Sequence, residues 1–595
     1  MTTNPTLRPA DDTSRARMAR LTAAYGAAAL VLVGISRWLA GGGRLSASSL
    51  TSIAFVVVAA YPLVLAFAWW RTTRAPAAKA AADTRTERRL SARGVGLVAA
   101  GVGALVAAAW VGMRPLPEAT KSDPGAAPPA PLVAVLPLLD LDRRGDRTLA
   151  DGVTELFVDG LAAVDGLEVR GRVSAESFID VNRDAADIGA VLGAAVVLDG
   201  TIRRAPGDLR LVVRLVDVAS GESLWTVSAD TTEAGLFVIR DRVVRGVAGA
   251  LGLGVGDRVL RRLERRRTNP AALDLWMLGR FRWAAGARGD LAEAASFYHQ
   301  AIGADSGYAA AWTALADAYA TLPRFTRYPP AGAREYGAAA ARTALQLDAE
   351  GAGAHTALGE ILFVYEHDWA GGRSHLERAA ELDPGDAAPR DRLCELDLAL
   401  AHLEAARAEC AEARRRDPLA YRPAWLAAGL ARASGDLPAS LRSLDSLAAA
   451  YPDFEPLAGE RAITRLLVVR SNPEPESSRA AVEADLAGWF ELLADPPVAD
   501  SLASTLATAA VGTGSAGSAR RALEEVAANL APAPAQLVAL YARFGQLDRA
   551  AELALQALAD RRPGALGFGV QPEYASLRAR ADVAQALAAA GLPAS

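Results

Sequence analysis

Three long apolar stretches dominate the start of the chain, at positions 21–39, 50–70 and 94–113. Each holds about 20 residues, and a helix rising about 1.5 Å per residue crosses a hydrocarbon core of roughly 30 Å with that length. A signal peptide would explain the first stretch alone, but two more stretches follow and no Ala-x-Ala cleavage site ends the first. The pattern predicts three transmembrane α-helices within residues 21–113, preceded by a cytoplasmic tail at 1–20.

Positively charged residues are distributed unevenly between the short loops. Four arginines precede the first span, and six arginines with Lys79 lie between the second and third spans. Only Arg44 lies clearly between the first and second spans, and Arg114 and Lys121 follow the third. Because positively charged loops stay in the cytoplasm, we expect a multi-pass protein of the cytoplasmic (inner) membrane. Its C-terminal domains are then periplasmic or extracellular.

The next part of the chain alternates between strand and helix patterns. Residues 114–131 are proline-rich and predict an extended linker. The apolar run at 131–139 then predicts a buried strand, and residues 148–164 have helical spacing. Further predicted elements are strands at 167–171 and 195–204, helices at 185–194 and 236–251, and a hairpin over 209–230 that turns at Ser220 and Gly221. This order predicts a small α/β domain at residues 132–255.

Two stretches of this domain resemble a known family. They read VAVLPLLDLDRRGDRTLADGVTELFVDGLAAVDGLEV and VLGAAVVLDGTIRRAPGDLRLVVRLVDVASGESLWTVS. The order of the elements, the segment Ala150–Glu155 and the hairpin around Asp217–Trp225 resemble the TolB-like N-terminal domain of bacterial TPR signalling proteins, over about residues 131–252. In that family the domain is commonly joined to TPR repeats, and often to a winged helix, a nucleotide cyclase or a kinase. Membrane helices stand in that position here, so the resemblance implies the architecture without those activities.

A motif recurs in the Ala/Leu/Arg-rich helical sequence that follows. Ala-x-x-Leu-Asp occurs at 344–348 and 379–383, and residues 413–417 repeat it with Arg416 in place of Leu, so that successive copies start 35 and 34 residues apart. This is the period of tetratricopeptide (TPR) repeats. We therefore expect an all-α TPR superhelical solenoid over residues 268–595, with about five recognisable repeats and two or three degenerate ones.

The expected solenoid would present a concave surface lined by the first helix of each repeat. Such surfaces hold extended peptides or partner helices. Asp317, Glu360 and Glu395 occupy equivalent first-helix positions in successive repeats, each directly after a small residue. The hypothesis is an acidic strip that binds a basic segment of a partner protein, and the alternative is a solvated polar face.

Cys394 and Cys410 are the only cysteines, and they are expected on the two helices of one repeat. An oxidising exterior permits a disulfide between them if their Cα atoms lie within about 7 Å. Two buried free thiols are the alternative, and the preference of repeats for small side chains at these positions favours it.

Composition and motifs point away from other kinds of site. The net charge of −4 leaves no basic surplus for nucleic acid. No G-x-S-x-G elbow or P-loop occurs, and the G-x-G-x-x-G at 512–517 has no strand before it, so it predicts an inter-helix turn. The segment Asp140–Asp151 departs from a calcium loop, and the five histidines lack metal-ligand spacing, although His367 and His375 could approach one another. We expect no catalytic residue, no metal and no cofactor.

The sequence thus predicts a non-enzymatic scaffold or adaptor that binds partner proteins on the non-cytoplasmic face of the membrane. The alternative is a sensor, in which the TolB-like domain receives a signal that the spans relay to a cytoplasmic partner at the basic loop 71–93. The sequence leaves the partner and the oligomeric state open.

Overall fold

A computed structural model gives the fold of the chain from residue 130 onward. The described residues are 130–142, 147–170, 184–205, 208–285, 288–326, 328–451, 455–471, 475–493, 496–530 and 534–594. The predicted tail, the three predicted transmembrane helices and nearly all of the linker lie outside these residues. Among the helices of the described ranges, none combines the length and the apolar character that crossing a membrane requires.

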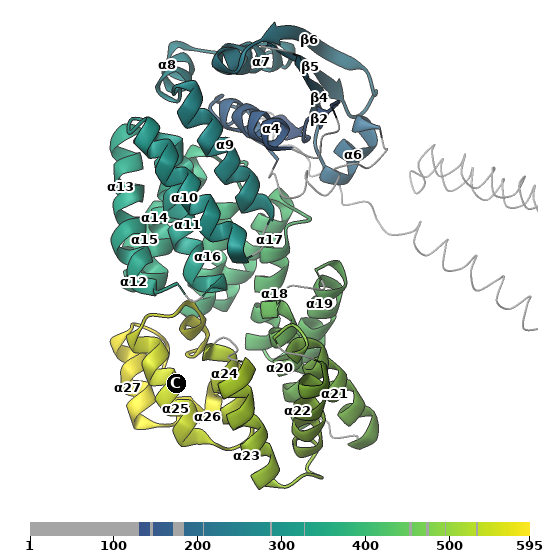
Figure 1. Cartoon of the computed structure of the whole chain (residues 1–595), viewed down its shortest axis with the longest axis vertical. Helices are drawn as coiled ribbons and strands as arrows, with labels where there is room; N and C mark the ends of the chain where they lie inside the picture. Colours follow the sequence, from purple (N-terminus) through teal and green to yellow (C-terminus); the bar gives the residue numbers. More distant parts are fainter. Residues whose placement is uncertain are drawn as a thin grey trace, which may run out of the picture. The chain divides into compact units, whose positions relative to one another are not determined.

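The described part begins with a mixed sheet flanked by helices (Figure 1). Its strands are β1 (Leu132–Val135), β2 (Leu139–Asp140), β3 (Glu168–Val169), β4 (Val196–Ala205), β5 (Asp208–Asp217) and β6 (Ser223–Thr231). The spatial order is β3-β1-β4-β5-β6, with β2 beside β4. Strand β1 runs parallel to β3 and β4, whereas β4, β5 and β6 are antiparallel. The helices are α4 (Thr148–Leu161), α6 (Ala185–Leu192), α7 (Leu236–Ala250) and α8 (Asp257–Arg265).

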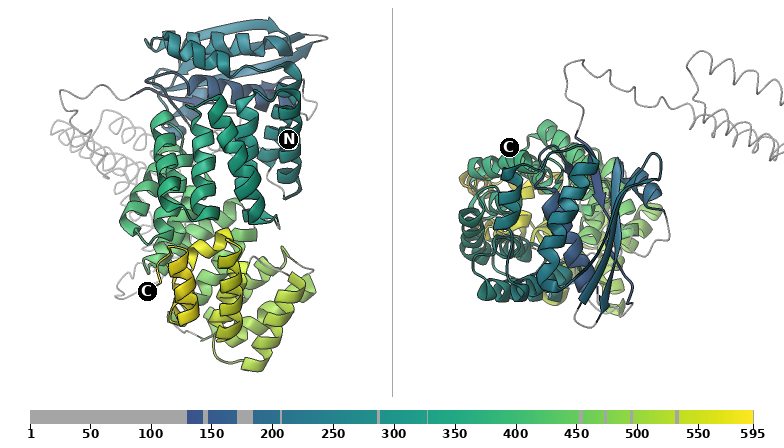
Figure 2. Two further views of the ribbon diagram at one scale, coloured as in Figure 1. Left: turned by 90° about the vertical axis from the view of Figure 1, so that its left-hand side faces the viewer. Right: turned by 90° about the horizontal axis from the view of Figure 1, so that it is seen from above.

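Alternation along β1 explains why helices cover both sides of the sheet at this strand. Val133 and Val135 belong to the core shared with α4 and α7, and Ala134 and Leu136 belong to a smaller core under α6. The view from above in Figure 2 shows α4 and α7 on the side of the sheet that faces the rest of the helices. The predicted order of strands and helices, including the hairpin whose turn contains Gly221 at φ +71°, is confirmed for this small mixed sheet.

The remainder forms a TPR-like solenoid of successive helix pairs, seen side by side in Figure 2. The pairs are α9 (Pro270–Ala285) with α10 (Arg288–Ala304), α11 (Ala309–Phe325) with α13 (Ala338–Leu347), α14 (Ala352–Ile361) with α15 (Trp369–Leu382), α16 (Ala388–Ala399) with α17 (Leu403–Arg416), α18 (Tyr421–Ala433) with α19 (Leu437–Ala450), α20 (Glu455–Ser471) with α21 (Pro475–Phe490), α22 (Pro496–Ala510) with α23 (Ala516–Glu525), and α24 (Pro534–Arg543) with α25 (Leu547–Ala559). Short π-helical segments adjoin three of these helices, namely η2 (Ala333–Gly337), η3 (Leu362–Glu366) and η4 (Val526–Leu530).

The recurring sequence motif marks the end of the second helix in three pairs. The backbone N–H groups of Asp348, Asp383 and Asp417 donate to the carbonyl oxygens four residues earlier, at 2.8, 3.0 and 2.9 Å. These acceptors belong to the alanines of the motif, which are at most 1% exposed because the next helix packs closely against them. The motif therefore combines a helix stop with a small packing residue. The turn at Gly512, where φ is +81°, likewise ends α22 and confirms the predicted inter-helix turn.

The C-terminal end of the array folds back onto its middle. The indole N–H of Trp369 donates to the carbonyl of Ala590 at 3.0 Å, and Arg561 donates to the carbonyl of Tyr365 at 3.0 Å. These contacts join residues near α27 (Ala581–Ala589) and α25 to the third helix pair. The array therefore differs from the open superhelix that a repeat period alone suggests.

We predict that Gly385→Ala destabilises the protein by about 1–3 kcal/mol, because a Cβ atom at this position would overlap a neighbouring strand. That Cβ would lie 2.6 Å from the backbone nitrogen of Val169 in β3 and 2.7 Å from its oxygen. Thermal unfolding of the full-length protein in detergent measures the effect.

Gly303→Ala is the matched control. A Cβ at Gly303 in α10 would meet nothing within 4 Å, so the substitution should be neutral or stabilise by up to about 1 kcal/mol. Equal effects of the two substitutions would contradict the close contact between the α15–α16 turn and β3.

Candidate functional site

A cavity of about 500 Å³ lies on the concave side of the first helix pairs. Helix α4 and strand β3 form one wall, and α8 contributes a second. The first helices of five successive pairs, α9, α11, α14, α16 and α18, line the rest. First helices therefore do line the inner surface, as expected, but the mixed-sheet part of the same chain covers that surface over these pairs.

Arginine contacts hold the sheet part in this position. The Arg280 Nη2 atom on α9 lies 2.6 Å from a carboxylate oxygen of Glu155 on α4. Arg266, directly after α8, donates to the carbonyl oxygen of Asp159 at 3.0 Å and to the carboxylate of Asp348 at 3.3 Å. Since these contacts join α4 to the start of the array, the concave surface of the first pairs is covered by the same chain and is not exposed as the repeat pattern alone predicts.

Arg170 makes a further contact, at the end of β3. Its Nη1 atom donates to the carbonyl oxygens of Arg415 and Arg416, which are the last residues of α17. The final carbonyl groups of a helix lack intrahelical partners and carry partial negative charge, so a guanidinium stabilises them. This contact ties the edge of the sheet to the fourth helix pair.

One side of the cavity is built on an ionic network of three arginines and three carboxylates. Its members are Arg324, Arg392, Arg422, Glu360, Asp391 and Glu395, from α11, α14, α16 and α18. Glu360 is 1% exposed and accepts from Arg324 and Arg392, both at 2.8 Å. Glu395 accepts from Arg324 at 2.8 Å and from Arg422 at 2.6 Å. Every guanidinium of the network contacts two carboxylates, so the buried charges compensate one another.

The same contacts determine the ionisation of the two glutamates. Burial alone would raise the pKa of Glu360, but the charges of Arg392, Arg324 and Arg422 outweigh burial and hold the pKa at about 2. Burial likewise opposes ionisation of Glu395, and Arg324 and Arg422 hold the pKa of Glu395 below its ordinary value. Both side chains are therefore carboxylates at neutral pH.

These contacts change the interpretation of the predicted acidic strip. Asp317, Glu360 and Glu395 do lie on successive first helices, α11, α14 and α16. However, Glu360 and Glu395 each form ion pairs with two arginines of the same array. Their charges are already compensated and do not attract a basic partner. They do not form a solvated face either. Sequence spacing could not reveal this, because Arg324 and Arg422 come from pairs that are far apart in the chain.

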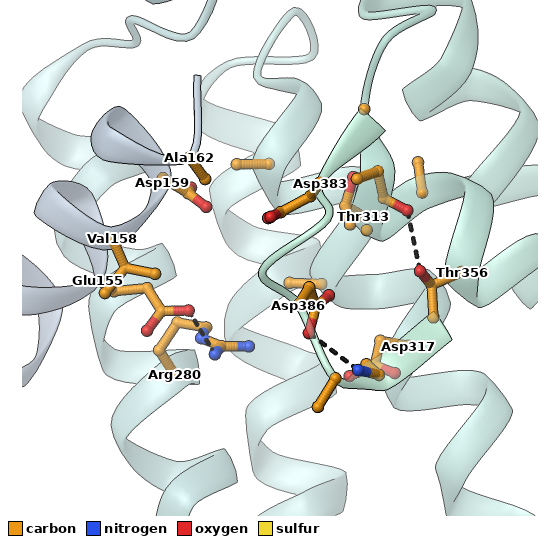
Figure 3. Close-up of a pocket in the computed structure, with 18 of the residues that line it drawn as sticks. Glu155, Val158, Asp159, Ala162, Arg280, Thr313, Asp317, Thr356, Asp383 and Asp386 are labelled. Atoms are coloured by element: carbon orange, nitrogen blue, oxygen red, sulfur yellow. Dashed lines mark hydrogen bonds and ion pairs between the residues drawn. The ribbon is translucent and has the colours of Figure 1, made fainter. Parts of the chain in front are cut away.

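Asp317 belongs to a second group of acidic side chains around the cavity, shown in Figure 3. The group consists of Asp159 on α4, Asp317 on α11, and Asp383 and Asp386 in the turn between α15 and α16. None of the four forms an ion pair with another described residue. Only Asp317 was predicted as a site residue from the sequence, where Asp383 occurred as the last residue of the recurring motif.

Burial changes the ionisation of these four carboxyls. It raises the pKa of Asp159, of Asp317 and of Asp386 above the ordinary value. Burial and the neighbouring Asp386 together raise the pKa of Asp383 to about 7. Backbone N–H groups of Gly385 and Ala388 donate to the two turn aspartates, at 3.2 and 2.9 Å.

The two cysteines meet between α16 and α17. Cys394 and Cys410 are joined by a disulfide with a Cα–Cα distance of 5.2 Å, and they are 0% and 3% exposed. The pair packs with Leu398, Ala406 and Leu430 in a small core of its own. Of the two possibilities that the sequence left open, the structure contains the bonded one.

The sequence allowed an approach of His367 to His375, but His375 contacts His355 instead. His375 Nδ1 lies 2.8 Å from His355 Nδ1, whereas His367 stacks on Trp369 with ring centroids 5.7 Å apart. Burial lowers the pKa of both His355 and His375, so the contact joins two neutral rings. Within the described ranges, no group of three or more His, Cys, Asp or Glu side chains is arranged to hold a metal ion. Part of the loop that partly resembles a calcium site, from 143 to 146, lies outside these ranges.

Comparison with known proteins gives one curated relative. No family model matches the chain. Over 205 residues, 34% of its length, the chain is 30% identical to putative adenylate cyclase 3 of Rhizobium meliloti (strain 1021). The matched region is 35% of that protein, so the chain spans about a third of this relative.

This similarity contradicts the prediction that the chain is not an enzyme, because the relative bears the name of an enzyme. The prediction relied on nucleophile and phosphate-binding motifs with fixed sequence spacing. Such motifs detect only sites whose residues lie close together in the chain.

Several solved structures contain similar helical arrays. Yeast Tom70 is 13% identical with a TM-score of 0.32, covering 59% of this chain and 81% of that chain. YrrB, a TPR protein with an unusual peptide-binding site, is 19% identical with a TM-score of 0.22, covering 33% and 93%. The human IFIT1 dimer with PPP-AAAA is 12% identical with a TM-score of 0.32, covering 55% and 81%. These TM-scores are too low to support a fold assignment. The repeat fold is therefore assigned from the helix pairs and the repeat period of this chain.

We predict that Glu360→Gln lowers the free energy of unfolding at pH 7 by about 3 kcal/mol, because Arg324 and Arg392 lose a shared buried partner. The folded pKa of about 2 lies below the ordinary 4.5, so the carboxylate stabilises the fold fully above pH about 4.5. Its contribution disappears as the pH falls toward 2. The difference between wild type and variant should therefore shrink over that interval in denaturant titrations.

Glu377→Gln serves as the matched control for this substitution. Glu377 is 55% exposed at its side chain and lies 3.9 Å from Arg373, so its removal should change stability by less than about 0.5 kcal/mol at any pH. A pH-independent loss in Glu360→Gln would contradict the assigned ionisation.

Proposed function

We propose that this chain is a membrane-tethered scaffold whose TPR-like array binds partner proteins on the non-cytoplasmic side of the membrane. One observation carries the proposal. The inner surface of the array already holds a helix, α4, through side-chain contacts such as Glu155 to Arg280. A surface that recognises a helix of its own chain has the shape and the charged groups for recognising a protein segment.

The membrane tether and its orientation are parts of the proposal. The three apolar stretches before residue 114 support a tether, and the excess of arginine in the tail and in the loop between the second and third stretches supports the orientation. The Cys394–Cys410 disulfide fits this placement, since disulfides persist in oxidising compartments. The proposal also assigns residues 132–255 to the TolB-like family, which the resembling motifs and their strand order support.

A partner protein needs a part of the inner surface that α4 does not cover. Helix α4 and its neighbours cover the inner surface from α9 to α18. The equivalent first helices beyond them are α20, α22 and α24, and Thr505 on α22 is a partly exposed example. We place the partner-binding surface on these later first helices.

A reporter fusion tests the orientation. Alkaline phosphatase, which is active only outside the cytoplasm, should be active when fused after Ser595 and inactive when fused after Ala78, between the second and third apolar stretches. Enzyme activity normalised to fusion protein level is the readout. The opposite pattern would place the array in the cytoplasm and remove the proposed location, while leaving the binding role open to the next test.

Site-specific crosslinking tests partner binding. A photo-crosslinking amino acid at Thr505, on the first helix of its pair, should give a discrete adduct in native membranes. The same amino acid at Arg520 on α23, the second helix of the same pair and an exposed position, is the control and should give none. Adducts are detected by electrophoresis and identified by mass spectrometry. Equal yields from the two positions, or none from either, would contradict binding through the first helices.

A second candidate function is sensing, and the cavity favours it. The cavity lies between the proposed TolB-like part and the array, so that a molecule bound there would contact both. Such a molecule would change how firmly the two parts hold together.

A further inference from the structure

The carboxyl groups around the cavity fall into two classes, those with a guanidinium partner and those without one. The glutamates of the ionic network, and Glu155 beside Arg280, each have a guanidinium partner. The four aspartates at positions 159, 317, 383 and 386 have none among the described residues, although arginines line the same cavity. Figure 3 shows these aspartates entering one space from three different elements. Among the described residues, compensation within the chain is therefore incomplete at this group.

An unpaired carboxylate inside a protein is costly, because burial removes its hydration without replacing it by an opposite charge. Backbone N–H groups partly replace that hydration for Asp383 and Asp386, whereas no hydrogen bond to the side chain of Asp159 or Asp317 is found in the described part. The raised pKa values of all four are a consequence of the same cost. A cation placed among the four carboxylates would offset this cost of burial.

A buried acceptor in the cavity wall also lacks a partner. Asp391 is 2% exposed, yet its Oδ1 atom has no hydrogen-bond partner among the described residues, so it can accept from a bound donor. Groups of this kind are rare in native proteins and indicate that a partner is supplied from outside the chain. The rings of Trp276, Trp283 and Phe325 add an apolar and aromatic portion to the same wall.

The arrangement of charges determines the kind of cation. A metal ion needs several ligands converging on one point, and no group of three or more suitable side chains converges in the described ranges. Here the charges are instead distributed between α4, α11 and the α15–α16 turn. A flexible chain with several cationic groups matches separated carboxylates, and its methylene groups can lie against aromatic rings.

We propose that the cavity binds a small organic cation carrying two or more ammonium or guanidinium groups, with Asp159, Asp317, Asp383 and Asp386 as its charge partners. The volume of about 500 Å³ lies in the range of small-molecule sites. Because Asp159 belongs to α4 and Asp317 to the array, the bound cation bridges the two parts. This inference goes beyond the scaffold function and does not depend on it.

Binding of spermidine to the full-length protein in detergent tests the proposal. We expect saturable binding by calorimetry and an increase in the unfolding temperature. Triethylene glycol, a neutral chain of similar length, should do neither, and Mg²⁺ at equal ionic strength should not reproduce the increase. An equal increase with Mg²⁺ would overturn the proposal, since it would show general screening of charge.

Two variants connect binding to these aspartates. Asp317→Asn with Asp386→Asn should weaken spermidine binding at least tenfold, and Asn at position 386 can still accept from the Ala388 N–H. Without ligand the variant should unfold at the same or a higher temperature, because it loses unpaired charges. Asp159→Asn, on α4, repeats the test from the opposite wall. Glu404→Gln removes a carboxylate that is 90% exposed and should bind like wild type.

A dipeptide of two arginines distinguishes the sources of the cation. Tighter binding of the dipeptide would support a guanidinium-bearing peptide as the ligand, and tighter binding of spermidine would support a polyamine. Absence of saturable binding by both probes would overturn the proposal. Wild-type affinity in the aspartate variants would overturn it as well.

Discussion

The compensation of buried guanidinium groups is the constraint on which the inner side of the array depends. An unpaired charge inside a protein costs several kcal/mol, so a buried arginine has to meet carboxylate or carbonyl oxygens with good geometry. Arg324, Arg392 and Arg422 do so by sharing Glu360, Asp391 and Glu395 across four first helices. The alanines at the ends of the second helices let the pairs approach, and the network determines the register in which they meet.

The position of the mixed sheet follows from the same chemistry. Arg280 and Arg266 reach α4, and Arg170 reaches back from the sheet to the last carbonyls of α17. Each contact joins segments that are distant in sequence, and together they turn the concave surface of the first pairs into the wall of a cavity. The C-terminal segment closes on the third helix pair in a comparable way, through Trp369 and Arg561. The repeats thus form part of a closed body whose inner surface is partly occupied by its own chain.

This arrangement separates two roles within one array. Where the carboxylates are matched by arginines, the inner surface is structural and has no charge left for a partner. The four aspartates have no arginine partner in the described part of the chain, so the cavity keeps negative charge that an external cation can neutralise. Binding of a protein segment and binding of a small cation would therefore use different parts of the inner surface, the first beyond α18 and the second beneath α4.

The sequence by itself determined the elements of this protein, and the tertiary structure decided which surfaces remain available. Apolar periodicity and turn residues predicted the strands and the hairpin at Gly221, because these features depend on neighbours within a few residues. The recurring motif that ends at Asp348, Asp383 and Asp417 predicted the repeat period. Three features were not predictable in this way. They are the ion pairs of Glu360 and Glu395 with arginines, the contact between His375 and His355, and the covering of the first helices by α4. They depend on contacts such as the one between Glu155 and Arg280, 125 residues apart, which exist only once the chain has folded.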